Sequence, residues 1–307
     1  MNRPAPRSID DYLSQLRAAL DAEDPALIQD ALYDAEEYLR AEVAANPGKS
    51  ETDVLELIAS TYGAPDEVAT AYRDTEVKVK AALRTPPARP RPENPSVANR
   101  FFGVYSDPRA YTSLFFMLLS LVTGIVYFTF AVTGLALSFG LAILIVGFPF
   151  FLAFIGMTRV ISLGEGRLLE AITGERMPRR PLHPGAPASF FARIGHMLKD
   201  PRTWSTLAYF LLMMPLGILY FTLAVTLLSI GVSFAALPFF KLWDAVTGHD
   251  YFVRHVNLGV DFLDNWVGYV ILGILGVLVI TALMHLARGI GRVHGRVAKA
   301  LLVTPGG

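Results

Sequence analysis

Residues 110–158 read AYTSLFFMLLSLVTGIVYFTFAVTGLALSFGLAILIVGFPFFLAFIGMT and contain no Asp, Glu, Lys, Arg or His. A helix that crosses a bilayer needs roughly 20 apolar residues, so this stretch is long enough to cross twice. In hydrocarbon every backbone amide needs an internal partner, which favours helices over irregular loops. The stretch therefore predicts a transmembrane helical hairpin. We expect its turn near Gly134, because the connection has room for only a few residues.

Two further chargeless stretches follow, at residues 203–240 and 266–284. Together with the hairpin they predict an all-α polytopic membrane protein with about four transmembrane helices. The stretch 203–240 is too long for one straight span, but two spans would force the basic tail outside. We therefore expect one span to about Leu228, followed by an interfacial or re-entrant piece that ends at Pro238.

Basic residues indicate the orientation. Residues 159–202 hold eight Lys and Arg, and the tail after residue 284 holds four without an acid. Residues 241–264 hold four Asp against two basic residues. Because Lys and Arg concentrate on the cytoplasmic side, both basic segments and both termini are expected in the cytoplasm, at a bacterial inner membrane. An external loop is expected at about residues 241–265.

The membrane part contains an internal repeat. Residues 107–114 (DPRAYTSL) align without gaps on residues 200–207 (DPRTWSTL). At the same offset, residues 124–129 (GIVYFT) align on residues 217–222 (GILYFT). Two such matches at one offset indicate a duplication.

The end of each copy also matches, since residues 159–172 echo residues 288–301. The second copy carries an insertion of about forty residues before this match, in which the external loop lies. The copies therefore run from about 107 to 174 and from about 200 to 302. Each closes with an amphipathic segment that is expected to lie in the plane of the membrane interface.

Both copies begin with Asp-Pro-Arg, and these residues are the candidate site residues of the chain: Asp107, Arg109, Asp200 and Arg202. Aspartate caps the first amides of a helix, proline suits the first turn, and arginine suits the level of the anionic headgroups. We favour this role in starting and anchoring a helix over a ligand site. Membrane lipids are thus the first expected partners.

The region before the membrane part is acidic and amphipathic. Residues 8–76 hold seventeen Asp and Glu against four Lys and Arg. Apolar residues recur at helical spacing, with breaks at residues 46–48 and 63–65, so four short helices are predicted. We expect an acidic cytoplasmic helical bundle over 1–84. A proline-rich linker is expected over 85–99, before a membrane domain over 100–307.

Two family resemblances follow from these motifs. Residues 8–76, with DAEEYL at 34–39 and YGAPDEVA at 62–69, resemble the small helical domain called HAAS, "helices associated with sensors". Residues 107–302 resemble the sensor domain found at the N-terminus of many bacterial sensor histidine kinases. The resemblance covers the paired apolar hairpin, the repeat and the Arg/Gly-rich closing segments. It implies a membrane signalling protein with a cytoplasmic partner, often a PadR-like transcription regulator for the HAAS class.

Catalytic machinery is not apparent. The sequence has no Cys, and its six His show no metal-ligand spacing on a helix face, so no catalytic, cofactor-binding or metal site is expected. No phosphoacceptor helix or ATP-binding domain of a kinase is recognisable, and we expect no enzyme activity. The apolar stretches lack the mid-membrane charges that ion transporters usually carry.

These features favour a sensor that relays a membrane or envelope signal to a cytoplasmic partner through its N-terminal domain. The acidic domain is expected to dock on the arginine-rich cytoplasmic segments until a partner or signal competes. A transporter or lipid-handling protein, and a membrane scaffold, remain the alternatives. Homo-oligomerisation stays open, and direct binding of nucleic acid is not expected.

Overall fold

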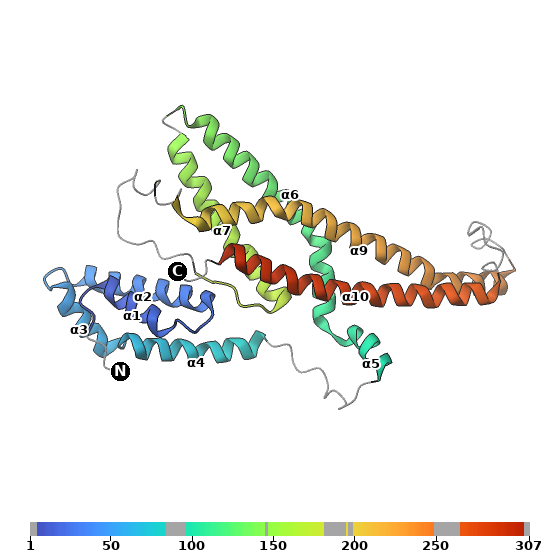
Figure 1. Ribbon diagram of the computed structural model, residues 1–307, viewed down its shortest axis with the longest axis horizontal. Coiled ribbons are helices and arrows are strands. Elements are labelled where there is room, and N and C mark those ends of the chain that lie inside the picture. The colour runs from blue at the N-terminus through green and yellow to red at the C-terminus, as the bar shows by residue number, and fades with distance from the viewer. Residues whose placement is uncertain are drawn as a thin grey trace. The chain divides into compact units, whose positions relative to one another are not determined.

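The fold is helical, as the computed structural model of the chain shows for residues 5–83, 96–144, 147–180, 195, 199–248 and 265–303. These described residues contain no strand. Four of their helices are long and apolar enough to cross a membrane: α6 (Pro108–Leu141), α7 (Gly147–Thr173), α9 (Pro201–Thr247) and α10 (Trp266–Leu302) (Figure 1). The predicted all-α, multi-pass membrane fold is therefore confirmed.

The chain divides into two compact units, each built from separate segments. The first unit contains Met1–Pro86, Thr129–Leu211 and Gly295–Gly307, and the second contains Pro87–Phe128 and Leu212–His294. Helices α6, α9 and α10 thus contribute residues to both units.

The N-terminal part of the first unit is a bundle of four helices: α1 (Ile9–Ala19), α2 (Pro25–Ala45), α3 (Glu51–Thr61) and α4 (Pro65–Leu83). The breaks lie where the sequence predicts them. Ser50 and Asp53 form a capping box at the start of α3. Gly63 follows the helix with φ 109°, a left-handed conformation that favours glycine.

The core of this bundle is apolar and fully enclosed. Helix α1 packs against α2 and α4, and α2 also contacts α3. Tyr12, Leu16 and Leu39 are completely buried, and the Tyr12 hydroxyl donates a 2.8 Å hydrogen bond to the Gly63 carbonyl. Each buried side chain of this size contributes about 1.5–3 kcal/mol. The burial therefore stabilises a bundle of only four short helices.

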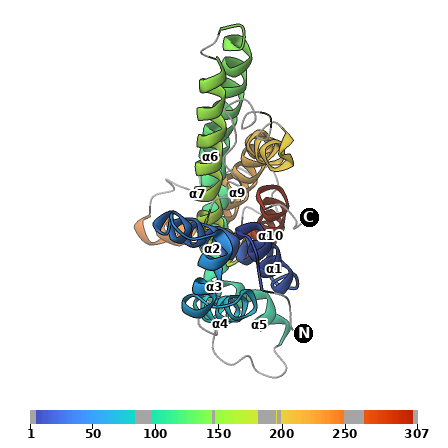
Figure 2. The same cartoon turned by 90° about the vertical axis from the view of Figure 1, so that its left-hand side faces the viewer.

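The hairpin turn does not lie near Gly134, so that prediction is wrong. Helix α6 continues through Gly134 to Leu141, and α7 begins at Gly147. A Cβ atom at Gly134 would lie 2.0 Å from Cε2 of Phe154 in α7. The end of α6 and the start of α7 run side by side there, as Figure 2 shows. Glycine thus permits close helix packing at this position rather than a turn.

The re-entrant piece predicted before Pro238 is also absent, because α9 is one continuous helix that contains Pro215 and Pro238. Its 47 residues span about 70 Å at 1.5 Å per residue, more than twice the roughly 30 Å of hydrocarbon. A Cβ at Gly273 of α10 would lie 2.5 Å from Cγ of Pro238. The neighbouring helix therefore accommodates the proline ring, and the helix does not break there.

Two other predicted boundaries change. Residues 241–247, assigned to the external loop from the sequence, continue α9, and residues 249–264 lie outside the described part. Of the predicted linker, residues 85–95 also lie outside it. Ser96 already caps α5 (Val97–Phe102), which continues into a 3-10 turn, η1 (Gly103–Ser106). The closing segment of the first repeat is not a separate interfacial helix, since residues 161–172 belong to α7.

The duplication is visible in burial. Positions 93 residues apart are buried in both copies, along one stripe of α6 and one of α9: Ala110 and Thr203, Ser113 and Thr206, Phe116 and Tyr209, Met117 and Phe210, Ser120 and Met213, Tyr127 and Tyr220, Ala131 and Ala224. In the second unit the two helices cross closely. A Cβ at Gly124 would lie 2.5 Å from the Met213 carbonyl oxygen, and one at Gly217 would lie 2.2 Å from that of Ser120. The two copies therefore contact one another through equivalent residues.

Candidate functional site

The two Asp-Pro-Arg motifs start α6 and α9 in the same way. Oδ1 of Asp107 accepts the amide of Arg109, and Oδ1 of Asp200 accepts the amide of Arg202, each at 3.0 Å. These are side-chain caps of the first helical turn. Arg109 is exposed, whereas Arg202 is partly buried and has a polar partner in the N-terminal bundle. The motifs thus share a helix start and differ in what their arginines do.

The second oxygen of each aspartate binds an arginine from the end of the other copy. Asp200 Oδ2 lies 3.1 Å from Nη2 of Arg159 in the first unit. Asp107 Oδ2 lies 3.1 Å from Nη1 of Arg288 in the second unit. Arg159 and Arg288 are equivalent in the repeat, so each copy places its closing arginine on the first residue of the other copy.

A buried charge cluster of the first unit surrounds Arg176, in the segment after α7. Its guanidinium contacts Asp30 of α2 at 2.8 Å, Glu76 of α4 at 3.2 Å and Glu170 of α7 at 3.9 Å. All four side chains are less than a tenth exposed. The N-terminal bundle is thereby joined to the end of α7 by one buried cation.

The segment that follows Arg176 adds backbone contacts to the same aspartate. The amides of Arg179 and Arg180 both donate to Oδ1 of Asp30 at 2.8 Å. The Arg180 side chain lies over the Tyr33 ring and forms an ion pair with Asp34 at 2.8 Å. One face of α2 is thus covered by residues 176–180, which we call the arginine segment.

Two further contacts tie α2 to the long helices. Gln29 donates to the Arg180 carbonyl at 2.5 Å and accepts a hydrogen bond from Arg202 Nη1 at 2.7 Å. Lys299, near the end of α10, lies 2.5 Å from Asp24, the N-cap residue of α2. Three separate parts of the membrane domain therefore hold α2 in the first unit.

Burial dominates the electrostatics of this cluster. Burial raises the pKa of the Asp30 carboxyl, although the amides of Arg180 and Arg179 and the Arg176 guanidinium favour its charged form. For Arg176, burial disfavours the cation, but Asp30, Glu76 and Glu170 outweigh it and raise its pKa. Oε1 of Glu76 is buried, with no hydrogen-bond partner within the described ranges. The cluster therefore contains a permanent cation and, in Asp30, a carboxylate that is costly to ionise.

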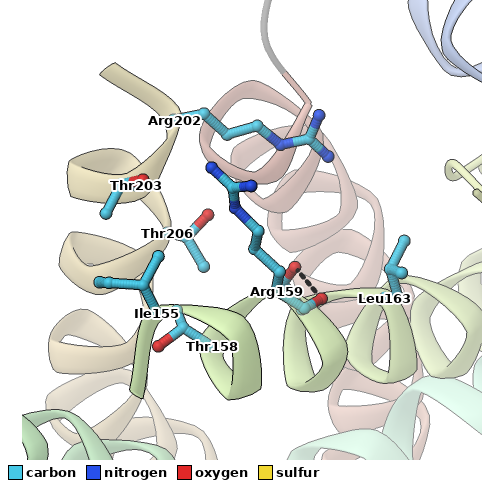
Figure 3. Close-up of a pocket in the computed structure, with 8 residues that line it drawn as sticks. Ile155, Thr158, Arg159, Leu163, Arg202, Thr203 and Thr206 are labelled. Carbon is cyan, nitrogen blue, oxygen red and sulfur yellow. Dashed lines mark hydrogen bonds between the residues drawn. The ribbon is translucent and has the colours of Figure 1, made fainter. Parts of the chain in front are cut away.

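A pocket lies between α7 and the first turns of α9, with Arg202 among its lining residues, as Figure 3 shows. Its lining carries two arginines, four hydroxyls and two aliphatic side chains: Arg159, Arg202, Thr158, Ser162, Thr203, Thr206, Ile155 and Leu163. Oγ1 of Thr203 is buried and has no hydrogen-bond partner in the part of the chain that the structure describes. Such a lining suits an anion. Within the described residues, no group of three or more His, Asp or Glu is placed to hold a metal.

Sequence reasoning anticipated part of this site. It singled out Asp200 and Arg202, and it expected the acidic bundle to dock on arginine-rich segments. Arg176 was only one of the eight basic residues in 159–202, and nothing in the sequence distinguished Gln29, Asp30 or Glu76 as its contacts. The charge asymmetry between the two parts was the available signal, but it does not select individual pairs.

Comparison with known proteins identifies a matching family. A family model described as "Putative sensor" matches residues 116–302, which is more than half of the chain. The match begins after the N-terminal bundle and does not cover it. Searches of curated proteins and of solved structures returned no match.

Proposed function

Because the chain belongs to the "Putative sensor" family, we propose that it is a non-catalytic membrane sensor that relays a membrane or envelope signal to a cytoplasmic protein through its N-terminal bundle. The observation that carries this proposal is the burial of Arg176 among Asp30, Glu76 and Glu170. It joins the sensor domain to a domain that the family model does not include. The bundle itself is proposed to be of the HAAS type.

The chemistry of the cluster suits a switch. A buried ion pair gains Coulomb energy but loses hydration, so its net contribution to docking is small. Removing one member is different, because it leaves a buried charge uncompensated, at about 3–5 kcal/mol. A small rearrangement of the arginine segment would therefore shift the docking equilibrium strongly.

The docked face of α2 is also the face that a partner would need. Gln29, Asp30 and Asp34 all contact the arginine segment. Release would expose an acidic surface to a basic cytoplasmic protein, for which a PadR-like regulator is the proposed class. With both termini in the cytoplasm of a bacterial inner membrane, such a partner would have access to it.

The docking step is testable by distance measurement, since the chain has no cysteine. Spin labels at Lys49→Cys in the bundle and Ala171→Cys on α7 report whether the bundle is docked, and both positions are exposed. In the otherwise unchanged chain we expect one narrow distance distribution. Arg176→Met should broaden it and lengthen the mean distance.

The matched control is Arg167→Met, because Arg167 is an exposed arginine on α7 that belongs to no ion pair in the described residues. It should leave the distribution unchanged. If Arg176→Met also leaves it unchanged, the proposed switch is wrong. The relay itself predicts that Arg176→Met increases the amount of cytoplasmic partner recovered with the full chain, and that deletion of residues 1–84 abolishes it.

A further inference from the structure

The pocket beside Arg202 has a repeat-equivalent region in the second copy, and the two differ in chemistry. Thr158, Ser162 and Thr203 of the pocket correspond to Ala287, Gly291 and Ala110. Thr206 corresponds to Ser113, and the arginines correspond to Arg288 and Arg109. At three of the four hydroxyl positions of the pocket, the other copy thus has no side-chain polar atom.

Packing explains why the second region has no space for the additional hydroxyls. A Cβ at Gly291 would lie 2.5 Å from Oγ of Ser113, so α10 and α6 touch there. Ala110 and Met284 belong to one apolar cluster beside it. In the first unit the equivalent space stays open and is lined by polar groups (Figure 3). The polar pocket is therefore a feature of one copy and not a general consequence of the fold.

One of these hydroxyls, that of Thr203, is buried without a hydrogen-bond partner among the described residues. Thr203 is 5% exposed, and it lines the pocket. A buried hydroxyl without a partner destabilises the fold, because its lost hydration is not replaced. Ala110 shows that a methyl group serves at the equivalent position. The hydroxyl therefore has a use that packing does not supply.

The charges identify the missing partner. Arg159 and Arg202 both line the pocket; Arg159 pairs with the Asp200 carboxylate, and the Arg202 guanidinium donates to Gln29. Arginines bind phosphate through paired N–H donors, and hydroxyls complete such sites. We propose that this pocket binds a phosphate group, with Arg159, Arg202 and the Thr203 hydroxyl as its donors.

The size of the pocket limits how the ligand binds. Its volume is about 20 Å³, enough for a group the size of one water molecule. The pocket therefore takes a terminal phosphate oxygen, while the rest of the ligand stays outside. A lipid headgroup and inorganic phosphate share this chemistry, and the test below separates them.

Binding would also reach the N-terminal bundle, an extension that rests on the proposed function. Arg202 donates from Nη1 to Gln29 at 2.7 Å, and Gln29 in turn contacts Arg180. A phosphate that turns the Arg202 guanidinium into the pocket removes the first of these bonds. The ligand thus competes with α2 for one side chain and weakens docking.

The binding test compares variants of the full chain in neutral detergent and in phosphatidylcholine nanodiscs. The probes are inorganic phosphate, measured by calorimetry, and phosphatidic acid or phosphatidylglycerol, measured by native mass spectrometry. Arg202→Gln should weaken binding about tenfold or more, since one charge-assisted donor is lost. Its matched control is Arg109→Gln, the equivalent arginine of the other copy, which should change affinity less than twofold. Binding of inorganic phosphate indicates a soluble ligand, and binding of the lipids alone indicates a headgroup.

A second variant guards against a folding effect. Thr158→Ala with Thr203→Ala installs the residues that the other copy already has, so the unfolding temperature should not fall. The phosphate probe should still bind at least fivefold more weakly. The proposed phosphate site is overturned if no probe binds to the unchanged chain, or if Arg202→Gln and Arg109→Gln lose the same amount of affinity.

The coupling between phosphate binding and docking is measured with spin labels at Lys49→Cys and Ala171→Cys. Their distance is measured after addition of whichever probe binds. We expect the distribution to broaden. An unchanged distribution with the probe bound overturns the coupling and leaves the phosphate site standing. An unchanged distribution in Arg176→Met overturns the proposed function, and the binding data remain independent of it.

Discussion

Arg159 at the end of the first repeat forms an ion pair with Asp200 at the start of the second, 3.1 Å away. The equivalent pair, Arg288 with Asp107, has the same separation. Each closing arginine therefore binds the helix start of the other copy. Each copy alone would therefore lack the ion-pair partner of its first aspartate.

The first prediction concerns this exchanged pair in the second unit. Arg288 and Asp107 are each about a quarter to a third exposed, so solvent screens the pair. A double-mutant cycle with Arg288→Gln and Asp107→Asn should give a coupling energy of about 0.2–1 kcal/mol. Asparagine retains the cap acceptor, which isolates the ion pair. The measurement is unfolding by denaturing detergent, and a coupling energy of zero would show that the pair is only a packing contact.

A much larger effect is expected at Arg176. Arg176→Met leaves Asp30, Glu76 and Glu170 without their common cation, and docking should weaken by about 3–5 kcal/mol. Limited proteolysis of the bundle and of its junction measures this loss. Arg167→Met should stay within about 0.5 kcal/mol, as expected for an exposed side chain. Equal protection of both variants would contradict the role of the cluster.

The pH dependence of docking follows from Asp30. Burial raises its pKa above the ordinary value of about 3.9, so its contribution favours docking below about pH 4 and is lost as pH rises through the raised pKa. Mild acidification from neutral pH should therefore not release the bundle through this group. Asp30→Asn should keep the acceptor for the amides of Arg179 and Arg180 and remove the proton uptake on docking. The spin-label distance measured across the pH range tests both statements, and release on mild acidification would contradict them.

The crossing of α6 and α9 makes a prediction about glycine. Gly124→Ala and Gly217→Ala each place a methyl group within 2.5 Å of a backbone oxygen, so the helices must separate. We expect a loss of about 1–3 kcal/mol for each, measured by thermal unfolding in detergent. Gly140→Ala on α6 is the control, since nothing lies within 4 Å of its Cβ. That variant should be neutral or slightly stabilising, and a similar loss there would point to helix flexibility instead of packing.

The orientation in the membrane is tested by cysteine labelling. In the cysteine-free chain, Ala171→Cys and Arg296→Cys should react with a membrane-impermeant maleimide only in inverted vesicles, because basic flanks stay in the cytoplasm. Asp250→Cys should react in intact cells. Reaction of Ala171→Cys from outside would reverse the topology and remove the access that the relay requires.

The sequence by itself determined the elements that depend on local pattern. Chargeless stretches, the helix breaks at Gly63 and Asn46, and the Asp-Pro-Arg motifs are each readable within a few residues, and the repeat follows from comparing such motifs. Local pattern was misleading at Gly134 and Pro238. Both positions lie inside continuous helices, and each packs against a neighbouring helix, Gly134 against Phe154 and Pro238 against Gly273.

Only the tertiary structure decided which charges meet. Arg176 is one of several similar arginines in the sequence, yet its guanidinium contacts Asp30, Glu76 and Glu170, which come from elements far apart in the chain. The same holds for the exchange of Arg159 and Arg288 between copies and for the unpaired hydroxyl of Thr203. Burial and pairing depend on how distant segments approach one another, and local periodicity carries no information about that approach.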